Sequence, residues 1–77
     1  MGKELIELLN KKKITMFVGG YDKNPDLMLV MFRDIESAHV NSYVHSLREF
    51  ENDICMNEWL MECLGNFEEC LKRRLGE

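Results

Sequence analysis

Three cysteines and two histidines are the residues of this 77-residue chain best suited to metal binding or nucleophilic chemistry. Cys55, Cys63 and Cys70 follow one another at intervals of eight and seven residues, and His39 and His45 precede them. Structural zinc sites need four convergent ligands, usually in closely spaced pairs, and the sequence has no Cys-x-x-Cys pair. We therefore expect no metal and no cofactor, and the odd cysteine count predicts free thiols.

Few residues are arranged for catalysis. His39 and His45 are six residues apart, which does not place them on one helix face, and His39 at the edge of an apolar pattern is typical of a structural histidine. No serine lies in a nucleophile-elbow motif. Gly19-Gly20 followed by Lys23 does not complete a phosphate-binding loop. We predict a protein that is not an enzyme and has no catalytic residues.

Charge is divided unevenly along the chain. The net charge is −4, yet residues 1–33 carry six basic and four acidic side chains, whereas residues 34–77 carry four basic and ten acidic ones. On one continuous helix, four of these acids lie in a narrow line opposite the apolar face. We define this acidic stripe as Glu51, Glu58, Glu62 and Glu69.

The acidic stripe has two interpretations. It is either a solvated face that keeps a small protein soluble or a docking surface for a basic groove on a partner protein. Trp59 lies at its border and is either a partly buried core residue or an interface anchor. If the helix begins only at Asp53, Glu51 leaves the stripe. The predicted partner-binding residues are Glu51, Glu58, Trp59, Glu62 and Glu69.

Two basic clusters, Lys11–Lys13 and Lys72–Arg74, suggest an alternative function. Both lie at the C-terminal ends of predicted helices, where cations offset the helix dipole without any ligand. They would also suit a regulator that binds nucleic acid. The negative net charge and the lack of an aromatic-plus-basic stacking motif disfavour this alternative.

About five elements must position these residues. Spacing and turn chemistry predict a helix over 3–12, strands over 14–18 and 27–32 joined by a long loop, a helix capped by Asp34 and reaching about residue 50, and a helix over 53–75. A capping-box pattern over 46–49 leaves open whether the last two helices are continuous or broken near Ser46–Asp53. The order α-β-β-α-α predicts an α+β fold, one domain over 1–77, with a two-stranded antiparallel hairpin packed on helices.

The predicted hairpin has no evident polar face, because both alternating sets of side chains in its second strand are apolar. Either the helices cover both faces, or a second copy or another protein covers one of them. We favour a homodimer. Its predicted interface consists of Phe17, Met28, Val30 and Phe32.

Location and function follow from these observations. No apolar run reaches the ~18 residues of a membrane span, and Glu4 and Glu7 interrupt the first apolar residues, so we expect a cytoplasmic protein without membrane contact. The small acidic layout is similar in size and acidity to phage-encoded inhibitor proteins, anti-CRISPRs among them, and this resemblance implies a protein that blocks a host enzyme. We predict a non-enzymatic interaction or inhibitor module that docks on a partner protein through its acidic helix face and exposed apolar surface.

Overall fold

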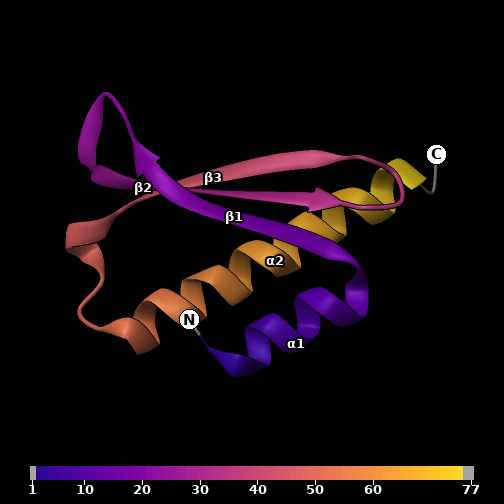
Figure 1. Cartoon of the computed structure of the whole chain (residues 1–77), viewed down its shortest axis with the longest axis horizontal. Helices are drawn as coiled ribbons and strands as arrows, with labels where there is room; N and C mark the ends of the chain where they lie inside the picture. Colours follow the sequence, from indigo (N-terminus) through magenta and orange to yellow (C-terminus); the bar gives the residue numbers. More distant parts are fainter. Residues whose placement is uncertain (1, 76–77) are drawn as a thin grey trace.

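Two helices and a three-stranded antiparallel sheet form the fold in the computed structural model, which describes residues 2–75. The helices are α1 (Lys3–Lys12) and α2 (Asp53–Leu75), and the strands are β1 (Ile14–Tyr21), β2 (Asn24–Asp34) and β3 (Val40–Ser46). The strand order is β1-β2-β3. Both helices lie on the same side of the sheet (Figure 1). The predicted α+β class, the antiparallel hairpin and both outer helices are confirmed.

The β1–β2 hairpin is longer than predicted. Tyr21 pairs with Asn24, so that only Asp22 and Lys23 form the turn where the sequence predicts a long loop. The register shifts between Gly20 and Tyr21, which marks a bulge just before this turn. The polar residues after Gly20 therefore extend the strands instead of separating them.

The helix predicted between Asp34 and residue 50 is wrong. This segment forms β3 and a short 3₁₀ helix, η1 (Leu47–Glu49), and η1 is separated from α2 by residues 50–52. Val40, Tyr43 and Val44 satisfy helical spacing and strand alternation at once, so spacing alone does not distinguish the two. The segment forms a strand because seven of its residues pair with β2. Its β-branched and aromatic side chains are also well suited to a strand.

Asp34 closes the β2–β3 turn instead of starting a helix. Its carboxylate accepts hydrogen bonds from the Ser37 hydroxyl at 2.7 Å and the Ser37 backbone N–H at 2.9 Å. These bonds, with a smaller contribution from nearby His39, hold the pKa of Asp34 below its ordinary value. Ala38 takes a left-handed φ of 61° where the chain turns back into β3. The capping chemistry predicted at Asp34 is present, but the element that follows is a strand.

The core lies between the sheet and the two helices. Alternate residues of β2 point toward α2, whose buried side chains recur at helical spacing. The rings of Phe32 and Phe67, both fully buried, lie 5.6 Å apart between centroids. The backbone N–H of Gly2 donates to the Asn57 side chain at 3.0 Å and links the start of α1 to α2. The buried apolar residues are Leu5, Leu9, Ile14, Met28, Val30, Phe32, Leu60, Cys63, Leu64 and Phe67.

Candidate functional site

The sheet has one face covered by helices and one face without cover from any other part of residues 2–75 (Figure 1). Because directly paired residues of antiparallel strands point to the same side, the register assigns each side chain to a face. The side opposite the helices is called the open face. It consists of Thr15, Phe17, Gly19, Leu27, Leu29, Met31, Arg33, Val40, Ser42, Val44 and Ser46.

The open face is mainly apolar although water reaches it. Phe17 keeps 59% of its surface exposed, and Val40 and Val44 keep 46% and 47%. The Phe17 ring lies over Gly19, where a Cβ atom would come within 3.0 Å of it. Arg33 is the single charged side chain that the register assigns to this face. An exposed apolar patch of this kind marks an interaction surface more often than a scattered apolar residue does.

The predicted interface residues do not share one face. Phe17 pairs with Met31 and points to the open face. Met28, Val30 and Phe32 point to the helices and are at most 5% exposed. The prediction that these four residues form one interface is therefore wrong, because the strand register places Phe17 on the opposite face from the other three. Leu29, Met31 and Val44 share the open face with Phe17. Reading residues 40–46 as a strand with alternating faces would have identified Val44 from the sequence.

The acidic stripe is only partly retained. Glu51 precedes the first turn of α2, so it does not belong to the stripe. Glu58, Glu62 and Glu69 are exposed along α2, and we call these three the α2 carboxylates. Glu69 lies 3.8 Å from the Arg73 guanidinium, an exposed pair one turn apart. Exposed pairs of this type contribute little to stability, so the α2 carboxylates remain available to other molecules.

Trp59 lies in an aromatic cluster with His45 and Phe50. The His45 ring stacks on Phe50 with centroids 4.4 Å apart, and the Trp59 ring meets His45 edge-on at 4.9 Å. Trp59 is half-buried and packs against the core from its border. The cluster joins β3, the segment after η1 and the first part of α2, so its members are far apart in sequence and no spacing pattern predicts it. Trp59 therefore contributes to packing of the fold.

The basic clusters converge at one end of the molecule. The C-terminal ends of α1 and α2 lie at the same end (Figure 1). The Lys12 ammonium is 2.8 Å from the Glu68 carboxylate. Lys13 is 3.2 Å from Glu36. Carboxylates thus neutralise part of the positive charge where the two clusters meet.

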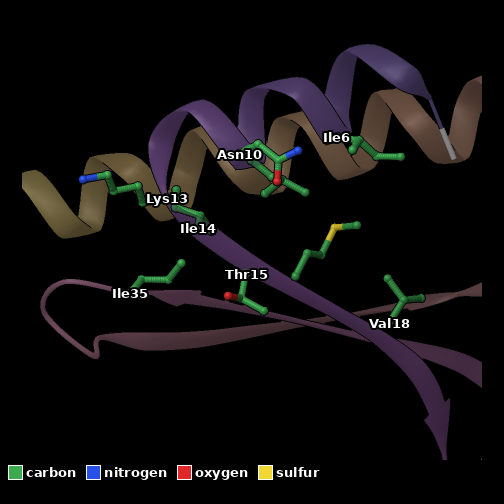
Figure 2. A pocket seen from close by; sticks show the side chains of 9 residues that line it. Ile6, Asn10, Lys13, Ile14, Thr15, Val18 and Ile35 are labelled. Carbon is green, nitrogen blue, oxygen red and sulfur yellow. The ribbon is translucent and has the colours of Figure 1, made fainter.

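A groove runs between α1 and the outer edge of β1. It has a volume of about 550 Å³ and opens to solvent. Ile6, Asn10 and Lys13 line it from α1 and the residue after it, and Met16 and Val18 line it from β1 (Figure 2). Ile35 lies at one end. We call this feature the edge groove. No pattern in the sequence predicts the edge groove, because it depends on how α1 lies beside β1.

Thiol and imidazole groups are placed for packing. Cys63 is buried, and burial together with the neighbouring Glu62 charge raises the pKa of its thiol to about 11. His39 stacks on Phe67, with centroids 5.6 Å apart. Within residues 2–75, no three His, Cys, Asp or Glu side chains lie together as metal ligands would. No helix in that range has the length and apolar character needed to cross a bilayer.

The two surfaces most suited to binding are therefore the open face and the edge groove, with the α2 carboxylates on the other side of the molecule. Searches with protein-family models, curated protein sequences and solved structures found no match to this chain.

Proposed function

We propose that the protein is a small non-enzymatic interaction or inhibitor module that acts in the cytoplasm. In this proposal it pairs with a second copy through the open face and docks on a partner protein through the α2 carboxylates. The observation that carries the proposal is the open face, on which Phe17, Val40 and Val44 are 46–59% exposed. Removing such side chains from water is favourable, and a second molecule is needed to do so.

The size of the open face suits a weak dimer of two copies. Three strands spaced ~4.8 Å apart and about seven residues long, at ~3.3 Å per residue, form a surface of about 14 by 23 Å. Two such faces in contact would cover about 640 Å² in total, which is below the ~1,000 Å² of a stable specific interface and fits a weak, concentration-dependent dimer. With Arg33 as its single charged residue, two copies of this face can meet without burying a cluster of like charges.

The α2 carboxylates would remain accessible in this dimer. They lie on the outer side of a helix that itself packs on the covered face of the sheet. Two copies joined at their open faces would therefore present one acidic helix on each outer surface. The partner that fits them is a protein with a basic groove or patch, because charge complementarity speeds and selects such encounters.

Light scattering on a size-exclusion column tests the dimer. We expect the wild-type chain to elute as a dimer at high micromolar concentration. The double variant Phe17→Glu/Val44→Glu should elute as a monomer, because a dimer of this variant would have to bury four carboxylates in its interface. Ile54→Glu is the matched control, because Ile54 is 69% exposed at the start of α2, away from the open face. A wild-type monomer at the highest soluble concentration would contradict the dimer.

Charge reversal tests the docking surface independently. A chain with Glu58→Lys, Glu62→Lys and Glu69→Lys should retain fewer proteins than wild type in affinity capture from the native host, and added salt should reproduce the loss. Glu4→Lys/Glu7→Lys on α1 reverses charge elsewhere and should leave capture unchanged. Equal capture by all three chains would remove the α2 carboxylates from the proposal.

One observation favours a second candidate, a regulator that binds nucleic acid. The clusters Lys11–Lys13 and Lys72–Arg74 meet at one end of the molecule, which increases the local positive charge. Binding to a mixed-sequence DNA or RNA duplex at physiological ionic strength, weakened by salt and by Lys11→Glu/Lys72→Glu, would support it. Absence of binding at low salt would reject it.

A further inference from the structure

The outer edge of β1 carries backbone groups that have no backbone partner among residues 2–75. In an antiparallel pair, directly opposed residues alternate between bonded and non-bonded pairs. The Ile35 N–H donates to the Lys13 carbonyl at 3.1 Å, so this opposed pair is a bonded one. Continuing the alternation along the register makes the pairs of Thr15 and Phe17 bonded, and the N–H and C=O groups of Met16 and Val18 point away from β2.

The edge groove lies directly beside these free backbone groups. Its α1 wall presents Ile6, which is 45% exposed, and the Asn10 amide, and its β1 wall presents Val18, which is 37% exposed (Figure 2). A strand edge next to a helix, with apolar side chains between them, is the arrangement by which sheets accept an extended peptide as an added strand. The backbone supplies hydrogen bonds, and the apolar walls accept every second side chain of the peptide.

Charge distinguishes between possible occupants. Lys13 is the single charged residue that lines the edge groove, and its ion pair with Glu36 is exposed and therefore weak, so the groove favours a segment with an acidic group at that end. The edge strands of a second copy, β1 and β3, contain no carboxylate. A second copy added at this edge would therefore leave Lys13 without a new acidic partner, whereas an acidic segment of another protein would provide one.

We infer that the edge groove binds an extended segment of another protein, which adds to β1 as a fourth strand. The segment has apolar side chains at alternate positions, and an acidic group near Lys13. Its backbone pairs with Met16 and Val18, while its inward side chains contact Ile6 and Val18. This inference rests on the proposed function only in that the ligand is a protein, since the site is separate from the open face and from the α2 carboxylates.

Peptide selection tests the inference directly. The probe is a phage-displayed library of random octapeptides, selected on the full chain, and the most enriched peptide is then synthesised. We expect enriched peptides to alternate apolar residues and to contain an acid, and we expect the amide resonances of Met16 and Val18 to shift most on binding. Failure to enrich any peptide over a resin control, or shifts confined to the open face, would overturn the inference.

Variants at the groove sharpen this test. Val18→Pro removes an outward N–H without removing a bond to β2, and it should weaken peptide binding about tenfold or more. Lys13→Glu should weaken binding of an acidic peptide by a similar factor, about tenfold. Phe17→Glu is the control on the same strand. Peptide binding should stay within about twofold of wild type, because the Phe17 side chain lies on the open face and does not contact the peptide in the edge groove.

Three further outcomes complete the test. If circular dichroism shows that Val18→Pro does not fold, Ile6→Asp on the α1 wall takes its place with the same expected loss of binding. If the edge groove instead accepts a second copy, the Ile6→Asp chain will be a monomer and the Phe17→Glu/Val44→Glu chain will still be a dimer, which overturns the inference. If only Phe17→Glu/Val44→Glu abolishes the dimer and this variant still binds the peptide, the edge groove binds peptide independently of dimerisation, which supports the inference.

Discussion

The two faces of the sheet have similar residue types and different surroundings. On β2, Val30 and Phe32 point to the helices and are fully buried, whereas the intervening Met31 points to the open face and remains partly exposed. Both sets are apolar, so hydrophobicity alone does not say which face becomes the core. The helices decide this, because α1 and α2 pack on one side only. The covered face therefore stabilises the fold, and the open face is free to bind.

The largest expected contrast between the faces is in stability. Phe32→Ala should lower the free energy of unfolding by about 3–5 kcal/mol, because it leaves a cavity against Phe67. Phe17→Ala removes the same side chain from the open face and should cost less than about 1 kcal/mol. Urea denaturation of a chain kept at low micromolar concentration, where a weak dimer dissociates, measures both. Equal losses would show that the open face is also covered in the folded monomer.

Thiol labelling provides a second comparison between covered and exposed sites. Cys63 is buried in the core, so a thiol reagent has little access to it. Burial also raises the pKa of its thiol from 9.0 to about 11, which reduces the fraction present as thiolate. Cys55 is partly exposed at the start of α2. At pH 8 we expect Cys55 to react with a maleimide or disulfide reagent on the order of 100-fold faster or more, as judged by mass spectrometry of single-cysteine variants. Comparable rates would mean that α2 does not pack as described.

The smallest expected effect concerns the turn that leads into β3. Hydrogen bonds from Ser37 lower the pKa of Asp34 from its ordinary value of 3.8. Because the folded chain then binds the proton less readily than the unfolded chain, Asp34 stabilises the fold above pH 3.8, and this contribution disappears as the pH falls below that value.

Asp34→Asn should therefore flatten the pH dependence of stability between about pH 5 and pH 2. Chemical denaturation of the two chains across this range measures the difference. Glu58→Gln, at an exposed position on α2, serves as the control and should retain the wild-type slope. An Asp34→Asn slope equal to that of wild type would remove the Asp34–Ser37 bonds as a source of acid sensitivity.

The difference between confirmed and corrected elements has a physical origin. The segments over 3–12 and 53–75 were predictable because each has a single apolar face at helical spacing and charges that suit its dipole. In 40–46, Val40 and Val44 on one side and Tyr43 on the other fit two periodicities, and only pairing with β2 selects the strand. The interface prediction failed for the related reason that the register, which is a tertiary property, assigns Phe17 to the opposite face from Met28, Val30 and Phe32.

The sequence by itself determined the two outer helices, the hairpin, the α+β class and the presence of apolar side chains on both faces of the hairpin. Local spacing and capping chemistry act over a few residues, so these features can be inferred without knowing the fold. Only the tertiary structure decided that residues 40–46 form the third strand, that the open face carries Phe17, Met31 and Val44, and that a groove lies between α1 and the free edge of β1. Each of these depends on contacts between segments distant in sequence, and such contacts leave no periodic pattern in the chain.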